Sequence, residues 1–460
     1  MSPENIPFLP IRVNSSWWGL KDLYALRSHY FDYYKKIQAK HPDIAHLKIL
    51  SRDVFHVFHP ELVREILVHQ SHLLIRWERA TKEFSYSMGD SVLVTEGKQW
   101  ERQRRILQPC FSPKKITDYA KLITLTTHSS LIKLTNAKDK QLTDIEVLMT
   151  NITLDVIMRV IFGNHQIKNS KPIAQAIQTL SQFAFNQILG IFPWPIWAPI
   201  KSVYRARLAI RKLNQLITQH MSLDTHDDQL TQNSLLKMLR DVRDPNNLDN
   251  GLSEQELHDQ IMVMFQAGHE TSSTALTWWA GLMASHTDLL DRIEHEVNSV
   301  LQGQDPTPET LNQLPLLQAS LKETLRLYPP AAILFTRRSL QKLHVGQYQI
   351  PRGSLISFSP FLIQRDERWF DAPDEFRPER FLDGQKEIPR GAWIPFGTGP
   401  RVCIGQHFAL MEMGIIAVML IQRFRLKWPE NQTWPSTNLA VTLKPATPMN
   451  LELVPTTRKF

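Results

Sequence analysis

The chain has 460 residues, of which 42% are hydrophobic, and its 53 Lys and Arg against 45 Asp and Glu give a net charge of +8. This length and apolar content suffice for a large core, and no long linker or low-complexity run divides the chain. Because the charge is modest and the Lys and Arg residues are scattered, the composition argues against nucleic-acid binding.

The N-terminal residues 1–16 contain three prolines and no continuous apolar run, so we expect neither a signal peptide nor a transmembrane anchor. Residues 20–40 have a helical pattern, and residues 45–57 alternate like the two strands of a hairpin. A short helix is expected to begin at Pro60, because proline suits the first helical position.

The segment 97–111 starts with a basic helical pattern that contains Trp100 and Arg104. These two residues are four apart and share one face of a helix, where an indole N–H and a guanidinium group can reach the same carboxylate. Arg102 and Arg105 fit a solvent-facing basic surface instead.

Further helices are expected over residues 144–162, 172–189 and 204–217. The connection between the second and third of these, residues 191–197, reads Ile-Phe-Pro-Trp-Pro-Ile-Trp and is unusually apolar for a loop. The polar run 224–250 is typical of a solvated loop around a short helix.

A long helix is predicted from Ser253, which has the spacing of a capping box, to about Ser285. Its middle reads Ala-Gly-His-Glu-Thr-Ser over residues 267–272. Glycine and a polar cluster inside an apolar helix are unfavourable for helix propensity and burial, and such a local violation often marks a functional site.

Another helix begins at Pro315 and contains Glu323 and Arg326, which are three apart on one face and can form an ion pair. Downstream, residues 347–350 and 354–358 alternate like strands around Pro-Arg-Gly, which predicts a second hairpin.

Cys403 lies in the stretch Phe-Gly-Thr-Gly-Pro-Arg-Val-Cys-Ile-Gly, residues 396–405, directly before an apolar helix-like run from Phe408 to Leu426. A sulfur at a helix N-terminus is near donor amides, which predicts a thiol shifted toward the thiolate that binds iron. The two cysteines, Cys110 and Cys403, lie in different contexts, so a reducing compartment such as the cytoplasm fits better than a disulfide framework.

This stretch resembles the haem-binding signature of the cytochrome P450 family, Phe-x-x-Gly-x-Arg-x-Cys-x-Gly, at Phe396, Gly399, Arg401, Cys403 and Gly405. The resemblance implies that Cys403 is the axial ligand of the iron of haem b. It also implies that the following residues contact the haem: Trp100, Arg104, Ala267, Gly268, Arg337, Phe396, Gly397, Arg401 and Gly405.

The 267–272 segment resembles the distal helix motif of the same family. There the small residues leave space above the iron, and the acid and the alcohol, here Glu270 and Thr271, carry protons toward it. The residues expected along the substrate pocket are Phe265, His269, Ala332, Ile333 and Leu334.

The segment 376–381 resembles the Pro-Glu-Arg-Phe element of the family, which implies that Arg380 joins Glu323 and Arg326 in a buried structural triad. The family's substrate channel is roofed by the part of the chain that contains residues 191–197. These aromatic residues therefore either form an apolar lip of the channel or bury against neighbouring helices.

The resemblance implies a mainly α fold with a small β lobe, formed by residues 40–70 and 340–360, within a single cytochrome P450 domain over residues 1–460. It implies a soluble, bacterial-type monomer that inserts an oxygen atom from O2 into a hydrophobic substrate of fatty acyl, terpenoid or steroid type. Electrons would come from a separate ferredoxin or flavodoxin with its reductase, docking near Lys98, Arg102, Arg105, Lys114 and Arg401.

Three other activities on the same scaffold remain open at this point. A peroxide-driven peroxygenase or an oxygen-independent isomerase is disfavoured by the intact Glu270 and Thr271 pair. A haem-based ligand binder or sensor without turnover is disfavoured by the same polar pair.

Overall fold

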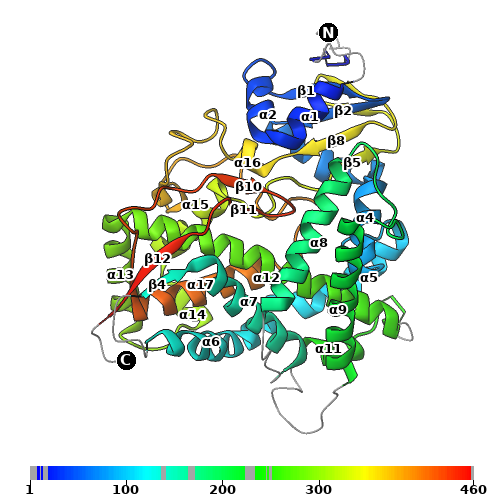
Figure 1. The fold of residues 1–460 in the computed structure, drawn as a ribbon. Helices are drawn as coiled ribbons and strands as arrows, with labels where there is room; N and C mark the ends of the chain where they lie inside the picture. The colour runs from blue at the N-terminus through cyan, green and yellow to red at the C-terminus, as the bar shows by residue number, and fades with distance from the viewer. Residues whose placement is uncertain are drawn as a thin grey trace.

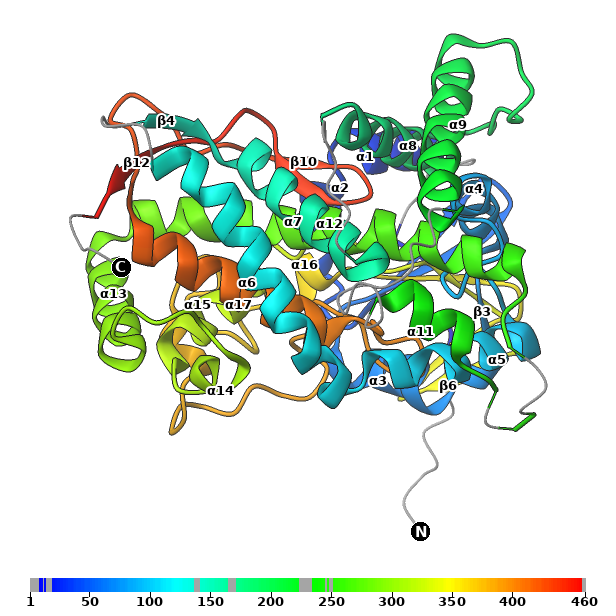
Figure 2. The same cartoon turned by 90° about the horizontal axis from the view of Figure 1, so that it is seen from below.

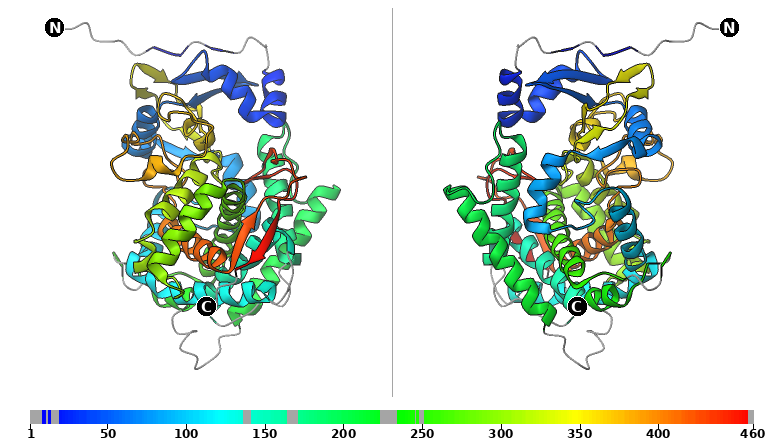
Figure 3. Two further views of the ribbon diagram at one scale, coloured as in Figure 1. Left: turned by 90° about the vertical axis from the view of Figure 1, so that its left-hand side faces the viewer. Right: turned by 90° about the vertical axis from the view of Figure 1, so that its right-hand side faces the viewer.

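The computed structural model describes residues 8–10, 12–13, 19–135, 141–163, 171–222, 234–244, 246–247 and 251–456. Figure 1 shows a lobe of strands with α1 and α2 at one end of the molecule and a helical body below it. Figure 3 shows the same division from two further sides.

The body consists mainly of helices, as predicted. Among the described residues the α-helices are α1 (Leu20–Ser28), α2 (Tyr30–Gln38), α3 (Pro60–Arg64), α4 (Glu78–Met88), α5 (Gly97–Leu107), α6 (Pro113–Thr135), α7 (Ile145–Phe162), α8 (Lys171–Leu189), α9 (Lys201–Ser222), α11 (Leu235–Asp241), α12 (Glu254–Ser285), α13 (Thr287–Leu301), α14 (Pro308–Leu311), α15 (Pro315–Leu327), α16 (Pro360–Ile363) and α17 (Gln406–Arg423). Short π and 3₁₀ turns are η1 (Glu65–His69), η2 (Ser71–Leu73), η3 (Gln108–Phe111) and η4 (Pro378–Phe381).

In the part of the chain that the structure describes, the strands form four small sheets. The largest contains, in order, β1 (Ile44–Ile49), β2 (Arg52–Val57), β8 (Leu355–Phe358), β5 (Arg337–Ser339) and β3 (Leu74–Arg76). The others are β4 (Gln141–Asp144) with β12 (Asn450–Pro455) and β9 (Phe424–Lys427), β6 (Leu343–Val345) with β7 (Tyr348–Ile350), and β10 (Thr437–Leu439) with β11 (Leu443–Pro445).

The first predicted hairpin is confirmed, because β1 and β2 pair antiparallel. The second is wrong, because β7 and β8 belong to different sheets. Gly346, with φ 54°, turns the chain so that β7 pairs with β6. Beyond the turn, β8 instead pairs with β5 and runs parallel to β2, which joins two segments about 300 residues apart into one lobe.

The helix predicted over residues 20–40 is two helices, because His29 leaves helical geometry at φ −145° and ψ 53°. The long helix predicted from Ser253 is α12, with the capping box formed by Ser253 and Glu256. It crosses the middle of the body between α7 and α17 (Figure 2). It is buried on nearly every side, so its apolar side chains and most of the polar ones in its middle lie in the interior.

Candidate active site

A cavity of about 810 Å³ lies at the junction of the β lobe and the helical body. Residues from α5, α12, the segment 330–337 and the loop that contains Cys403 contribute to its lining. Most of the side chains that face it are hydrophobic, so it suits a large apolar ligand.

The loop that carries Cys403 is held by its own backbone. The Cys403 amide donates to the Phe396 carbonyl oxygen at 3.0 Å, and Gly397 and Gly399 adopt φ 74° and 77°. A Cβ atom at Gly399 would lie 2.0 Å from the carbonyl oxygen of Leu67, so only glycine allows the loop to pack this closely on η1. The loop ends at Gly405, which caps the N-terminus of α17.

The Cys403 side chain is accessible from the cavity and otherwise surrounded by protein. Burial raises the pKa of the Cys403 thiol, although the Gly405 amide and the Arg104 charge lower it. The amide at the helix N-terminus thus acts in the predicted direction, but loss of hydration opposes it. A metal cation bound to the sulfur would supply the positive charge that a thiolate needs here.

Four arginines line the cavity near this loop: Arg76, Arg104, Arg337 and Arg401. Burial, followed by the charges of Arg401 and Arg337, holds the pKa of Arg76 well below its ordinary value. Burial also lowers the pKa of Arg337 and of Arg401 to about 10. Such a group of buried like charges is unfavourable unless an anion compensates it.

The protein compensates only part of this charge. Arg401 donates to Glu96 and to the Thr95 carbonyl oxygen at 2.9 Å, and its guanidinium lies 3.8 Å from the ring centre of Trp100. The backbone amide of Arg76 also donates to Glu96, at 3.2 Å. The buried Nε of Arg76 has no hydrogen-bond partner among the described residues. One carboxylate, Glu96, thus interacts with three of the four guanidinium groups, those of Arg76, Arg337 and Arg401.

These features fit a haem. The unsatisfied Nε and the excess positive charge match the two propionates of the porphyrin. The surface of the cysteine loop also leaves free space. A Cβ atom at Gly405 would meet no atom within 4 Å, and one at Gly397 would meet only Leu334, at 3.9 Å. The loop therefore leaves room for a flat ring, and Cys403 would hold its iron.

Ala267, Gly268 and Thr271 line the same cavity from the middle of α12. The Thr271 hydroxyl donates to the Ala267 carbonyl oxygen at 2.8 Å, which keeps its oxygen free to accept a further hydrogen bond. The structure therefore brings this part of the predicted distal motif to the cavity that contains Cys403.

Glu270 does not line the cavity itself, although it contacts Thr442, which does. Its buried carboxylate accepts hydrogen bonds from Ser181 at 2.8 Å and from Thr442 at 3.0 Å, and the Lys444 ammonium lies 3.8 Å away. Lys444 also donates to Glu146, at 3.2 Å. The acid of the predicted pair is thus part of a polar chain that leads from α12 past Lys444 to half-buried Glu146.

Residues 8–453 match the family model described as Cytochrome P450. The chain belongs to the cytochrome P450 family. Cyclooctatin synthase from Streptomyces melanosporofaciens is 28% identical over 408 residues, which cover 88% of each chain. Cytochrome P450 CYP72A613 from Trigonella foenum-graecum is 30% identical over 76% of this chain and 69% of its own. Echinocystic acid 23-monooxygenase from Saponaria officinalis is 29% identical over 84% and 77%, respectively.

The predicted fold class, cofactor and reaction are confirmed by this membership. Cytochromes P450 bind haem, and this cytochrome P450 is a monooxygenase that uses O2, a hydrophobic substrate and electrons from a redox partner. The relatives include plant proteins as well as a bacterial one. They therefore support the prediction of a bacterial-type enzyme only in part. Within the described ranges, no helix combines the length and hydropathy needed to cross a bilayer.

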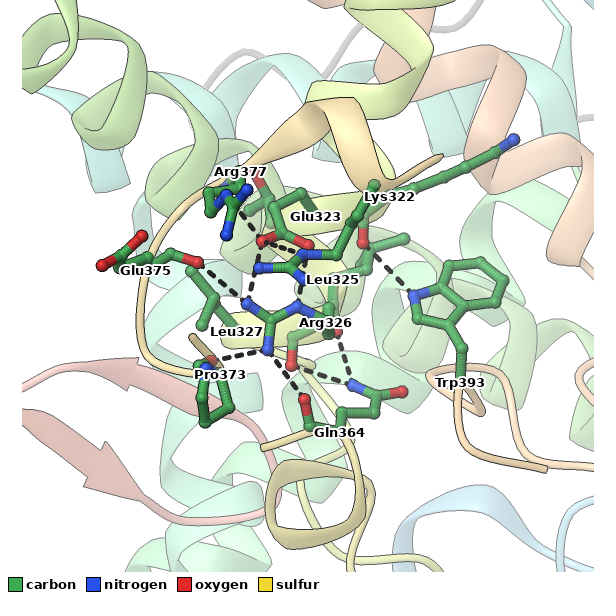
Figure 4. Close-up of polar contacts among 12 residues, drawn as sticks. Lys322, Glu323, Leu325, Arg326, Leu327, Gln364, Pro373, Glu375, Arg377 and Trp393 are labelled. Atoms are coloured by element: carbon green, nitrogen blue, oxygen red, sulfur yellow. Dashed lines mark hydrogen bonds and ion pairs between the residues drawn. The ribbon is translucent and has the colours of Figure 1, made fainter. Parts of the chain in front are cut away.

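The predicted triad is present in this cytochrome P450. Arg326 donates to both oxygens of Glu323, at 2.7 and 2.8 Å (Figure 4). Arg380 also donates to Glu323, at 3.0 Å. Figure 4 also shows Arg326 reaching the carbonyl oxygens of Gln364, Pro373 and Glu375. The Glu323 and Arg326 side chains have no exposed area, so this is an interior ion pair whose hydrogen bonds are satisfied.

Gln364 connects this triad to the cysteine loop, a role that the sequence did not suggest. Its amide nitrogen donates to the carbonyl oxygens of Leu325 and Arg326, at 3.0 Å each, and its amide oxygen accepts from Ile394 at 2.8 Å. Ile394 in turn accepts from the Gly397 amide at 3.0 Å. The triad thus supports the loop that presents Cys403.

The predicted pocket wall is only partly correct. Ile333 and Leu334 line the cavity, whereas Phe265, His269 and Ala332 do not. Phe265 and His269 lie on the side of α12 that packs into the core, where burial lowers the pKa of His269. Ala332 is buried under the lobe beside α16, where its carbonyl oxygen accepts from Ser359.

The predicted group of cations at the redox-partner site also changes, and one arginine of the cavity was not predicted. Arg102 pairs with Glu256 at 2.6 Å and Arg105 with Asp244 at 2.7 Å, while Arg401 is directed inward, so these three are engaged within the protein. Lys98 and Lys114 are exposed. Arg76 could not be predicted, because a single arginine in a short strand gives no local signal. Its place at the cavity depends on the pairing of β3 with β5.

Proposed function

We propose that this cytochrome P450 hydroxylates or epoxidises a terpenoid or a comparably bulky hydrophobic molecule. The observation that carries the proposal is that Cys403 and Thr271 line one large, mostly apolar cavity, with four arginines near the cysteine loop. Relatives named for acting on echinocystic acid and on 11-oxo-beta-amyrin support the substrate class. The fatty acyl alternative has less support from these relatives.

Haem bound to Cys403 supplies the activation of O2. In this proposal Cys403 would hold the iron, and Trp100, Arg104 and Arg76 would hold the propionates, with Arg337 and Arg401 adding positive charge. Ala267 and Gly268 leave space between α12 and the porphyrin because they have small or no side chains. Ile333, Leu334 and Phe335 exclude water from the substrate side.

Thr271 and Glu270 deliver protons in this proposal. The Thr271 hydroxyl donates a proton into the cavity and is reloaded from the polar chain that contains Glu270, Lys444 and Glu146. For this step the Glu270 carboxyl must exchange its hydrogen bond with Ser181 or Thr442 for one with a water molecule near Thr271. We further propose that a ferredoxin or flavodoxin with its reductase supplies the electrons to a monomeric enzyme, docking near Lys98 and Lys114.

The test compares the purified protein with Cys403→Ala and Cys110→Ala. We expect wild type and Cys110→Ala, whose thiol is buried in the core, to give the red-shifted carbon monoxide band of thiolate-ligated haem. Cys403→Ala should lose it. Wild type should also oxidise a terpenoid panel with O2, ferredoxin and reductase. Efficient turnover with hydrogen peroxide alone, or an unchanged band in Cys403→Ala, would overturn the proposal.

A further inference from the structure

The cavity extends beyond Cys403 and Thr271 into the β lobe. Its lining there includes Leu26 of α1, Tyr30 and Tyr34 of α2, Val54 of β2 and Ser357 of β8. Figure 1 shows α1, α2, β2 and β8 together at one end of the molecule. The part of the cavity that these residues line is its lobe end.

The 191–197 loop contributes one residue to the cavity. Ile191 lines it, whereas Phe192, Trp194 and Trp197 are 79%, 54% and 74% exposed. The interpretation that the aromatic residues of this loop bury against neighbouring helices is therefore wrong. Because Ile191 is aliphatic, the side chains of the loop offer a ligand in the cavity no hydrogen bond.

Polar side chains gather at the lobe end of the cavity. Tyr30 and Tyr34 are one helical turn apart on α2, and His56 and Ser357 are register partners in the parallel pair of β2 and β8. The rings of His56 and Tyr34 stack with their centroids 3.9 Å apart, and the rings of Tyr30 and Tyr34 lie 4.9 Å apart. Tyr30, Tyr34, His56 and Ser357 are all buried and form the lobe cluster.

The lobe cluster has more hydrogen-bonding groups than internal partners. The Ser357 hydroxyl oxygen lies 2.7 Å from Nδ1 of His56 and 3.4 Å from the Phe55 carbonyl oxygen, and both phenols also interact with it. A serine hydroxyl has one hydrogen to donate and two lone pairs, so it cannot bond all these groups at once. The fully buried Nε2 of His56 has no partner among the described residues. Unpaired polar groups in a protein interior are rare and call for a ligand or a water molecule.

The lobe cluster is uncharged at neutral pH. Burial lowers the pKa of His56 to about 3 and raises the pKa of Tyr30 and Tyr34 above the ordinary value for tyrosine. Phenol, imidazole and hydroxyl groups can each donate or accept a hydrogen bond, so they suit a hydroxyl or carbonyl oxygen. A carboxylate or an ammonium group is less suited, because the cluster itself would not balance its buried charge.

Leu334 connects the lobe end of the cavity to the cysteine loop. Its amide donates to the carbonyl oxygen of Phe358, the residue after Ser357, at 3.0 Å. Its side chain lies 3.9 Å from the position of a Cβ atom at Gly397. An apolar residue thus lies between the lobe cluster and the loop of Cys403, and a ligand with its oxygen at the cluster would present a hydrocarbon part on the Cys403 side.

We propose that the lobe cluster binds a hydroxyl or carbonyl group that the substrate already carries before this enzyme oxidises it. This inference rests on the proposed function and narrows its substrate class from terpenoids in general to oxygenated ones. The new oxygen then enters at a carbon remote from the first. The reaction that supplies the substrate must leave an oxygen function on the hydrocarbon, as water capture during ring formation or an earlier oxygenation does.

The test is equilibrium dialysis of the haem-loaded protein with tritiated ligands that differ in one hydroxyl group. The pairs are androstane with androstanol and cholestane with cholestanol, all carried by cyclodextrin. Wild type should bind the alcohol of at least one pair about tenfold more tightly than the hydrocarbon, because the hydrocarbon leaves the cluster unpaired. No preference for the alcohol in either pair would overturn the proposal.

Variants of two tyrosines on α2 assign the preference to the cluster. Tyr30→Phe/Tyr34→Phe keeps both rings and removes both hydroxyls, so it should lose most of the tenfold preference while binding the hydrocarbon as wild type does. Tyr33→Phe is the matched control, because the Tyr33 hydroxyl donates to Asp22 at 2.7 Å and does not line the cavity. An equal loss in both variants, or lower thermal stability of the double variant with an unchanged preference, would show that the cluster only supports the lobe.

A spectroscopic readout on the wild type does not depend on any variant. The infrared carbonyl stretch of bound androstanone should lie at lower frequency than in hexane, because a hydrogen bond weakens the carbonyl bond. It should return toward the hexane value in Tyr30→Phe/Tyr34→Phe and not in Tyr33→Phe. An unshifted carbonyl band in the wild type would contradict the proposal.

These measurements need neither O2 nor a reductant, so they separate the two hypotheses. A preference for the alcohols without oxidation of any terpenoid would overturn the proposed function and leave the polar subsite standing. Oxidation of terpenoids without that preference would do the reverse.

Discussion

Arg76 and Arg337 are direct register partners in the antiparallel pair of β3 and β5, and both line the cavity. Like charges opposite each other in a sheet destabilise it, and both guanidinium groups are buried. The arrangement is therefore unfavourable for the empty protein and favourable once an anion lies beside it. The haem propionates of a cytochrome P450 provide such an anion.

Replacing Arg76 should weaken haem retention without destabilising the protein alone. In Arg76→Leu, the lost charge-assisted hydrogen bonds are worth about 1.5–3 kcal/mol, so haem loss should be roughly 10- to 100-fold faster. Transfer of haem to an excess of apomyoglobin measures the rate. Arg338→Leu is the matched control, because Arg338 is the next residue on β5 and pairs with Glu78 instead. Equal rates for the two variants would contradict the assignment of Arg76.

Thr271→Val should uncouple reductant consumption from product formation. The variant keeps the shape of the side chain and removes the hydroxyl from the cavity, so reductant should still be consumed while peroxide replaces product. Thr277→Val is the control, because Thr277 makes the same hydrogen bond to the carbonyl oxygen four residues earlier but is fully buried elsewhere. The measurement is product and peroxide formed per reductant. Full coupling in Thr271→Val would rule out its role as a proton donor.

Glu323→Gln should destabilise the protein and reduce its haem content. The change leaves Arg326 and Arg380 without the carboxylate that both contact, at an expected cost of about 3–5 kcal/mol. Glu379→Gln, which breaks the solvent-exposed pair with Arg292, should cost about 0–1 kcal/mol. Thermal unfolding and the haem-to-protein ratio distinguish them. Similar losses in both variants would mean that the triad is not the support of the cysteine loop.

Glu412 should make stability depend on pH between about 4.5 and 8. Burial raises the pKa of this carboxyl to about 8, although a hydrogen bond from Ser272 lowers it, and its Oε2 has no partner among the described residues. Because the folded pKa is above the unfolded one, the stabilisation is complete below pH 4.5 and is lost as the pH rises through 8. The loss amounts to up to about 5 kcal/mol.

Glu412→Gln should remove most of this dependence. The melting temperature of the variant should fall less than that of the wild type between pH 5 and pH 8, and Glu367→Gln, at an exposed position, should follow the wild type. Parallel curves for wild type and Glu412→Gln would show that this carboxyl is ionised in the folded protein.

The sequence predicted best those parts of the site that lie within one short segment. Cys403 with its glycines and Thr271 with Ala267 are each set by local geometry, a loop in one case and a helix turn in the other, and the structure brings both to one cavity. Glu323 and Arg326 are three apart on one helix, so their pairing was also predictable.

The sequence predicted poorly those features of the site that depend on contacts between segments far apart in the chain. Arg76 reaches the cavity only through the register of β3 with β5, and Gln364 acquires its role only where α15 meets the segment around Ile394. Which side of α12 faces the cavity was likewise not evident, because the helix is buried on nearly every side. His269 and Phe265 were placed on the wrong side for this reason.

The cavity is lined by residues from Leu23 near the beginning of the described chain to Thr442 near its end, and Gly399 packs directly on the backbone of Leu67. A nascent chain on the ribosome therefore has no complete pocket until almost all of it has been translated. Haem would accordingly be taken up only after nearly the whole chain has been made.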